Sequence, residues 1–265
     1  MSFTRDPKVD ILKHSACYVV GVIGRQVQMD GFSLPQVSPQ SVLPAAVPIG
    51  MLRDSPVVAQ RVMGSECDQV DGLSLIDLRD VLASCPDDVI EAVLLGVQRL
   101  EFTESHLFCA VCSGSMSELG DTGKSCVQCH HTVYPHVTPA VLVLIEDDKR
   151  RVLLAQKSTW GDRYSVIAGF VEPGESLEAC CMREALEEVG FVVENPRYVA
   201  SQAWPFPHQL MVAFRVQWKS GDIVLDMDEL SDAQWFCEDN LPELPPEIAL
   251  SRGLIEHWRT TPTIQ

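Results

Sequence analysis

GFVEPGESLEACCMREALEEVGF, residues 169–191, is a glycine-containing loop that leads into an acidic helix. At about 100° per residue, Glu184, Glu187 and Glu188 occupy positions i, i+3 and i+4 and share one face of that helix. The apolar residues gather on the opposite face, which we expect to be the core side. These residues are Ala179, Met182, Ala185, Leu186 and Val189.

Three carboxylates on one helix face repel each other by several tenths of a kcal/mol per pair, so they call for a countercharge. Mg²⁺ or Mn²⁺ prefers oxygen ligands of this kind, and such an ion bridges pyrophosphate oxygens and activates water. The alternative is a solvated acidic face that Arg183 and nearby lysines neutralise. Three glutamates by themselves favour this second interpretation.

The full spacing from Gly169 to Phe191 favours the metal site, because it resembles the Nudix box at every fixed position. The resemblance implies that Glu184 and Glu188 are metal ligands, with Glu188 or a neighbour helping to deprotonate water. It leaves orienting or ligand roles to Glu175 and Glu187, while Arg183 orients a carboxylate. We expect Gly169 and Gly174 to permit the tight loop and Gly190 to form a left-handed helix C-cap.

Four cysteines precede this region in two pairs, Cys109-x2-Cys112 and Cys126-x2-Cys129, separated by thirteen residues. Each short loop turns two thiolates to the same side, so the spacing predicts one structural Zn²⁺ with four cysteine ligands. Four unrelated core thiols or disulfides are the alternative. We expect neither His130 nor His131 to bind the metal, because four thiolates complete the shell. The other cysteines are expected in the core: Cys17, Cys67, Cys85, Cys180, Cys181 and Cys237.

A second signature, SQAWPFPHQLM at residues 201–211, follows the box. It resembles the SQPWPFPxSLM signature of the NADH pyrophosphatase (NudC-type) subfamily, which also carries a zinc ribbon before its Nudix domain. Trp204 and Phe206, held by prolines, would offer rigid aromatic surface for a purine or nicotinamide ring. An apolar strand edge with a proline bend is the alternative for this motif alone. The resemblance implies substrate contacts by Gln202, Ala203, Trp204, Pro205, Phe206, Pro207, His208 and Gln209, of which Ala203 and Gln209 depart from the signature.

The resemblance extends from about Leu75 to Trp258. It implies that Glu229 and Ala168 join the catalytic metal site and that Phe170 stacks on nicotinamide. It also implies substrate contacts by Tyr134, Asp121, Arg79 and Ser251. Each assignment has a plainer alternative: Phe170 as a core aromatic residue, Arg79 as a solvated helix charge, Glu229 as a loop carboxylate.

Hydrophobic periodicity predicts the remaining organisation. Strands are expected at residues 17–23, 47–52, 140–145, 151–155, 209–218 and 223–225, and helices over 75–82, 87–100 and 250–258. With the resemblance, this indicates an α/β (α+β) fold: a Nudix α/β/α sandwich at 138–265, a four-cysteine zinc ribbon at 106–137 and a smaller α+β domain at 1–105.

Composition bounds the function further. With a net charge of −17 and 46% hydrophobic residues, the chain is expected to be globular and to have no general attraction for polyanions. No apolar run reaches the roughly 20 residues that span a bilayer, and residues 1–13 show no signal-peptide core, so we expect a cytoplasmic protein.

The resulting prediction is metal-dependent hydrolysis of NAD(H) to nicotinamide mononucleotide and AMP, and of NAD-capped RNA to 5′-monophosphate RNA, by a homodimer. Mg²⁺ or Mn²⁺ would be catalytic and Zn²⁺ structural. Two alternatives stay open. One is a Nudix hydrolase of another nucleoside diphosphate such as ADP-ribose. The other is a zinc-ribbon nucleic-acid-binding module that carries an inactive hydrolase fold.

Overall fold

The computed structural model describes residues 2–62, 72–119 and 122–262, and the chain divides into two compact units, Met1–His136 and Val137–Gln265. None of the helices in the described ranges is long and apolar enough to cross a membrane.

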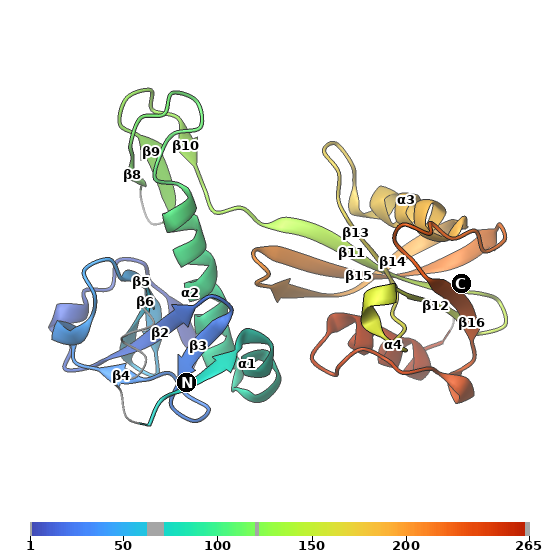
Figure 1. Cartoon of the computed structure of the whole chain (residues 1–265), viewed down its shortest axis with the longest axis horizontal. Coiled ribbons are helices and arrows are strands. Elements are labelled where there is room, and N and C mark those ends of the chain that lie inside the picture. The colour runs from blue at the N-terminus through green and yellow to red at the C-terminus, as the bar shows by residue number, and fades with distance from the viewer. Residues whose placement is uncertain (1, 63–71, 120–121, 263–265) are drawn as a thin grey trace. The chain divides into compact units, whose positions relative to one another are not determined.

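The first unit contains a seven-stranded mixed sheet in which β1, β5, β6, β2, β3 and β7 are neighbours in that order and β4 pairs with β2. The strands are β1 (Phe3–Arg5), β2 (Cys17–Ile23), β3 (Gln26–Met29), β4 (Gln36–Val37), β5 (Val47–Leu52), β6 (Ser55–Arg61) and β7 (Ser74–Asp77). Helix α2 (Asp87–Ser105) packs on this sheet (Figure 1). A Cβ at Gly96 would lie 3.1 Å from Val20 and 3.2 Å from Ala59, so glycine permits this close packing.

The helix predicted over residues 75–82 begins later than expected. Leu75 lies in β7 and pairs with Gln28 of β3, and α1 runs from Leu78 to Ser84. The Asp77 carboxylate accepts a hydrogen bond from the Arg79 N–H at 2.9 Å and caps the helix. Strand pairing with β3 therefore takes residues 75–77 out of the predicted helix, while the second predicted helix is confirmed as α2.

A small three-stranded sheet follows α2, with β8 (Met116–Leu119), β9 (Gly123–Cys126) and β10 (Thr132–Val133) in the order β10-β9-β8. The buried Lys124 ammonium group donates hydrogen bonds to the carbonyls of Thr103 at 2.6 Å and His106 at 3.0 Å. These are carbonyls at the C-terminal end of α2, which lack partners within the helix, so the lysine ties this sheet to α2.

The second unit is a three-layer α/β/α sandwich, as predicted (Figure 1). Its sheet has the order β14-β15-β11-β12-β16, with β13 paired to β11. The elements are β11 (Thr138–Glu146), β12 (Val152–Gln156), β13 (Ile167–Phe170), α3 (Leu177–Val189), β14 (Val192–Trp204), β15 (Gln209–Ser220), β16 (Asp232–Phe236) and α4 (Leu250–Thr260). Alternate residues of β11 face opposite sides: Val141 and Val143 pack towards α3, and Leu142 and Leu144 towards α4.

The predicted hairpin and last helix are confirmed as β11, β12 and α4, but the strand predicted at residues 223–225 is absent. The N–H groups of Val224 and Asp226 donate at 3.0 Å to the carbonyls of Val189 and Glu188 at the end of α3. Because the last carbonyls of a helix lack partners within it, this segment satisfies them instead of joining the sheet.

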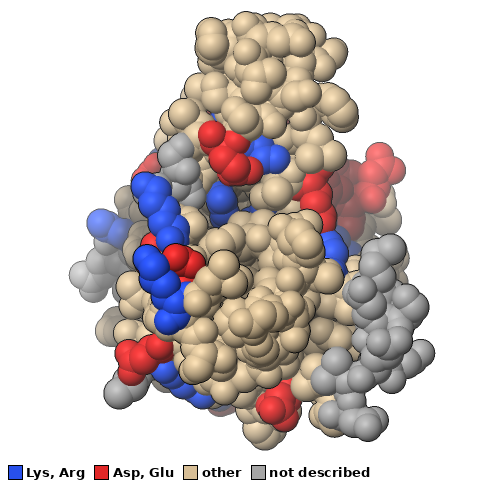
Figure 2. All heavy atoms as spheres, turned by 90° about the vertical axis from the view of Figure 1, so that its left-hand side faces the viewer, with Lys and Arg blue, Asp and Glu red and all other residues tan. Residues whose placement is uncertain are grey.

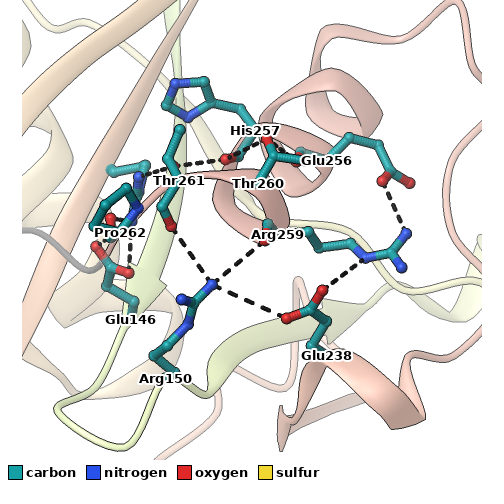
Figure 3. Close-up of polar contacts among 10 residues, drawn as sticks. Glu146, Arg150, Glu238, Glu256, His257, Arg259, Thr260, Thr261 and Pro262 are labelled. Atoms are coloured by element: carbon teal, nitrogen blue, oxygen red, sulfur yellow. Dashed lines mark hydrogen bonds and ion pairs between the residues drawn. The ribbon is translucent and has the colours of Figure 1, made fainter.

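The C-terminal end of α4 is held by the polar cluster drawn in Figure 3. Arg215 and Glu146 form a buried ion pair at 2.8 Å, and Arg215 also donates to the Pro262 carbonyl at 2.8 Å. Replacing Arg215 with Met is expected to lower the free energy of unfolding by about 3–5 kcal/mol, because it leaves a buried carboxylate without its cation. Urea unfolding measures this, and the double variant Arg215→Met with Glu146→Leu should regain most of the loss. A loss below about 1 kcal/mol in the single variant would contradict the argument.

Candidate active site

Helix α3 ends at the predicted C-cap, Gly190, and Ala185 and Val189 are buried as predicted, but the rest of its buried face differs from the prediction. The Ser176 hydroxyl accepts a hydrogen bond from the Ala179 N–H, and Gly190 has φ 74° at the C-cap. Met182 and Leu186, predicted in the core, are 42% and 55% exposed. The buried stripe instead contains Cys180, Cys181, Glu184, Ala185, Glu188 and Val189. Glu184 and Glu188 therefore lie on the buried side of the helix, where the Glu184 carboxylate faces Gly169 of β13. The Glu187 side chain is exposed to solvent.

Arg183 gathers the carboxylates at the exposed edge of this stripe. Its guanidinium group donates to Glu175 with both N–O distances at 2.9 Å, and to Glu184 and Glu187 at 2.8 Å each. It also donates to the Phe170 carbonyl at 2.9 Å. The guanidinium group lowers the pKa of the Glu175 carboxyl to about 2. These contacts suit the predicted orienting role of Arg183, because they join the loop before α3 to carboxylates on the helix.

Glu188 is the most deeply buried carboxylate of the site, with 3% of the residue exposed. Neither of its carboxylate oxygens accepts a hydrogen bond from a residue that the structure describes. Burial raises the pKa of this carboxyl to about 8. A buried carboxylate without donors is costly unless a cation binds it, so Glu188 fits a site for a divalent metal.

Glu229 lies beside Glu188, although it is 41 positions further along the chain. Its carboxylate accepts a hydrogen bond from the Lys157 ammonium group at 2.9 Å, and the same group lies 3.8 Å from Glu188. The lysine lowers the pKa of Glu229. Glu229 is therefore part of the acidic cluster and not an isolated loop carboxylate.

Gly169 has a different role from the one predicted. It lies in β13, where a Cβ would stand 1.8 Å from the Glu184 carboxylate, whereas Gly174 has φ 87° in the loop, as expected. Gly169 is needed because the carboxylate of α3 closely approaches the strand backbone.

Gly169→Ala is expected to displace the Glu184 carboxylate and to lower hydrolytic activity about 100-fold, since a shift of about 1 Å at a reacting centre has that effect. Rates of NADH hydrolysis measure it. Gly253→Ala, on an exposed position of α4 with open space around it, is the matched control and should keep wild-type activity. Equal activity of the two variants would contradict a positioning role for Gly169.

A cavity of about 210 Å³ includes in its lining Ala168 of β13, the residue next to Gly169. It is lined by Leu142, Trp160, Ser165, Val166, Ala168, Gln202, Trp204, Gln209, Met211, Ala249, Leu250 and Ser251. Five of these residues were predicted in the site: Ala168, Gln202, Trp204, Gln209 and Ser251. Trp160 was not predicted, because it stands in the loop after β12 with no motif around it.

Gln202 is engaged with the protein backbone at the edge of this cavity. Its amide nitrogen donates to the Ile248 carbonyl at 2.9 Å, and its amide oxygen accepts from the Leu250 N–H at 3.0 Å. The N-cap residue Ala249 has no side-chain cap of its own. Gln202 therefore caps α4 and positions Ser251, which lies in the first turn.

The WPFP motif lies where β14 ends: Trp204 is the last residue of β14 and pairs with Gln209 of β15, and residues 205–208 form the turn between the two strands. The rings of Trp204 and Phe206 lie 5.1 Å apart, and the Phe206–Pro207 peptide bond is cis. The His208 ring lies 3.0 Å from the Thr138 hydroxyl. Phe170 is 52% exposed, so its ring is available to a ligand and is not a core aromatic residue.

Residues predicted to contact substrate also occur in the first unit. Arg79 lies in the exposed first turn of α1, and the Tyr134 ring packs over Gly123, where a Cβ would lie 2.8 Å from it. Asp121 lies outside the described residues.

The four predicted zinc ligands converge in the first unit. The sulfur atoms of Cys109, Cys112, Cys126 and Cys129 all lie within 4.8 Å of one another, with three S–S distances of 3.4–3.6 Å. Zn–S bonds of about 2.3 Å in a tetrahedron require similar separations. N–H groups of Cys129 and Gln128 lower the pKa of the Cys126 thiol to about 6. The cluster fits one Zn²⁺, and neither His130 nor His131 belongs to it.

The cysteines outside this cluster differ in burial. Cys17, Cys180 and Cys181 are buried as predicted, Cys85 is partly buried, and Cys237 is exposed, contrary to prediction. Cys67 lies outside the described residues.

The raised and lowered pKa values of the cluster predict how stability changes with pH in protein without Mg²⁺ or Mn²⁺. Glu188 has a pKa of about 8 against an ordinary 4.5, so its favourable contribution is present below pH 4.5 and is lost as the pH rises to about 8. Glu175, with a pKa of about 2, has the opposite effect, which is lost as the pH falls from 4.5 to 2. Melting temperatures of zinc-loaded protein without Mg²⁺ or Mn²⁺ should therefore fall from neutral pH to about pH 9 less in Glu188→Gln than in the wild type. The same decline in both proteins would contradict the burial of an ionisable Glu188.

The comparisons with known proteins agree with this geometry. The NUDIX domain family matches residues 136–258. The chain is 40% identical over 217 residues to the "NAD-capped RNA hydrolase NudC" of Deinococcus radiodurans, a match that covers 80% of this chain and 76% of that protein. It is 40% identical over 183 residues to the protein of the same name from Chromobacterium violaceum, covering 69% of each. A crystal structure of a Nudix hydrolase from Nitrosomonas europaea is 26% identical and covers 60% of this chain and 96% of that one, with a TM-score of 0.48. The chain belongs to the NudC family of Nudix hydrolases.

Proposed function

We propose that this protein hydrolyses the pyrophosphate bond of NAD(H), giving nicotinamide mononucleotide and AMP, and that of NAD-capped RNA, giving nicotinamide mononucleotide and 5′-monophosphate RNA. The observation that carries the proposal is the buried Glu188 carboxylate, which has no described hydrogen-bond donor and lies beside Glu229. The names of the relatives from Deinococcus radiodurans and Chromobacterium violaceum support the choice of substrate.

In this proposal Glu184, Glu188 and Glu229, with the Ala168 carbonyl, hold Mg²⁺ or Mn²⁺. When bound, the metal neutralises phosphate charge and lowers the pKa of the attacking water. Arg183 holds Glu175, Glu184 and Glu187 in place through the hydrogen bonds described above. Glu175 and Glu187 orient the metal ligands, and Glu188 or a neighbouring carboxylate helps to take the proton from the water.

The dinucleotide is bound by aromatic and polar groups around the cavity. The exposed Phe170 ring stacks on nicotinamide, while Trp204 and Phe206 present a second aromatic surface. The rest of the loop, with Ala203, Pro205, Pro207, His208 and Gln209, and Ser251 complete the contacts. Arg79, Asp121 and Tyr134 are further contacts in a homodimer, and Zn²⁺ in the ribbon is structural. In the same proposal the protein is cytoplasmic, and its domains are residues 1–105, 106–137 and 138–265.

The nucleic-acid-binding alternative receives little support from the ribbon. Residues 107–117 and 125–133 contain no Lys, Arg, Asp or Glu, and the ribbon end of the first unit in Figure 2 is correspondingly uncharged. A module that binds nucleic acid needs basic residues to neutralise phosphates. The intact glutamates of the box also argue against an inactive hydrolase fold.

Product analysis tests the proposal. The full chain, loaded with Zn²⁺ and supplied with Mg²⁺ or Mn²⁺, is incubated with NADH, ADP-ribose or NAD-capped RNA, and products are separated by chromatography. We expect nicotinamide mononucleotides from NADH and from the capped RNA, at higher kcat/KM than AMP release from ADP-ribose. A clear preference for ADP-ribose would overturn the substrate, and no turnover of any of the three would overturn the enzymatic function.

A further inference from the structure

Lys157, the first residue after β12, places its ammonium group within the acidic cluster. The distances are 2.9 Å from Nζ to Glu229 Oε2 and 3.8 Å from Nζ to Glu188 Oε1. The lysine side chain is 28% exposed, whereas the Glu188 side chain is 4% exposed. One monovalent cation thus lies next to two of the carboxylates that the proposed function assigns to the metal.

The two cationic side chains of the site, Arg183 and Lys157, pair with different carboxylates. Arg183 donates to Glu175, Glu184 and Glu187 and to the Phe170 carbonyl, so several hydrogen bonds fix its guanidinium group. Lys157 makes one short ion pair, to the half-exposed Glu229, at the end of a flexible four-carbon chain. Its Nζ also lies 6.0 Å from the centre of the Trp160 ring, which offers the ammonium group a second favourable position.

We propose that Lys157 is the counter-ion of the metal-free cluster, and that a divalent cation binds Glu188 and Glu229 by displacing its ammonium group. The inference rests on the proposed function, because it uses the metal ligands named there. An ammonium group and a divalent cation on the same two carboxylates would lie within about 4 Å of each other and repel strongly. The lysine therefore positions both carboxylates before the metal arrives and lowers the net affinity for the metal.

Lys157→Met tests the inference, because methionine keeps most of the apolar stem and removes the charge. Lys157→Arg keeps the charge, and Lys219→Met removes a lysine of the same unit whose 2.7 Å ion pair with Glu194 is on the surface. Each full-length, zinc-loaded protein is stripped of Mg²⁺ and titrated with Mg²⁺ alone by calorimetry. All titrations are run in the same buffer at the same pH, so that the variants differ only at the substituted side chain.

We expect Lys157→Met to bind Mg²⁺ at least about fivefold more tightly than wild type, and the other two variants to bind it as wild type does. Melting temperatures give a second readout. In Lys157→Met the value without Mg²⁺ should fall, and the rise on saturation with Mg²⁺ should be larger than in wild type. Equal or weaker Mg²⁺ binding by Lys157→Met would overturn the inference, and so would an equal fall in melting temperature with and without Mg²⁺. These measurements need no substrate, so they separate this inference from failure of the proposed reaction.

Discussion

Replacing Glu188 with Gln is expected to lower kcat for NADH hydrolysis about 10³-fold or more, because the substitution removes a charged metal ligand from the centre of the acidic cluster. The amide is nearly isosteric, and the position has no described hydrogen-bond donor to lose. Initial rates of nicotinamide mononucleotide and AMP formation at saturating Mg²⁺ measure the effect.

The matched control is Glu178→Gln, which removes a carboxylate from the exposed first turn of the same helix. This variant should keep wild-type kcat and KM. Melting temperatures of both variants establish that they are folded. If Glu188→Gln kept more than about a tenth of wild-type kcat, the carboxylate could not be a required metal ligand.

Replacing Cys126 with Ser is expected to release the zinc ion and to unfold the ribbon around β8, β9 and β10. Structural Zn²⁺ contributes about 10 kcal/mol or more to the folding of small domains of this kind. In the described part of the ribbon, Val111 and Val127 are exposed and the four cysteine sulfurs lie at the centre. Apolar packing therefore cannot replace the zinc ion. Zinc content by mass spectrometry and amide hydrogen exchange in residues 107–133 measure the two effects.

Cys85→Ser serves as the control for this experiment. Cys85 lies at the end of α1 in the same unit, outside the cysteine cluster. The Cys85→Ser variant should retain one zinc ion per chain, and its ribbon amides should stay protected from exchange. A full zinc content in Cys126→Ser would show that the four thiols do not share one ion.

The two motifs with fixed spacing predicted their sites well. In the ribbon, two short loops each turn a pair of thiols to one side, and in α3 the 3.6-residue repeat places Glu184 one turn before Glu188. Gly190 as a left-handed cap also follows from a local conformational preference.

Predictions that depended on choosing a face or a partner were less successful. On α3 the prediction was correct for Ala185 and Val189 and wrong for Met182 and Leu186, because the buried face includes Glu184 and Glu188 instead of these two apolar residues. Residues 223–225 have a strand-like sequence, yet N–H groups of this segment pair with the end of α3. In both cases a particular tertiary neighbour decided the outcome.

Local spacing was therefore sufficient to predict that the four cysteine sulfurs converge and that Glu184 and Glu188 share one face of a helix, because the residues of each pair are a few positions apart. The tertiary structure alone brought Lys157 to Glu229, which is 72 positions away, and Trp160 to a cavity with Trp204. It also buried Glu188 and raised the pKa of its carboxyl group to about 8. Burial and charge compensation depend on the whole set of neighbours in space, which no spacing within one segment contains.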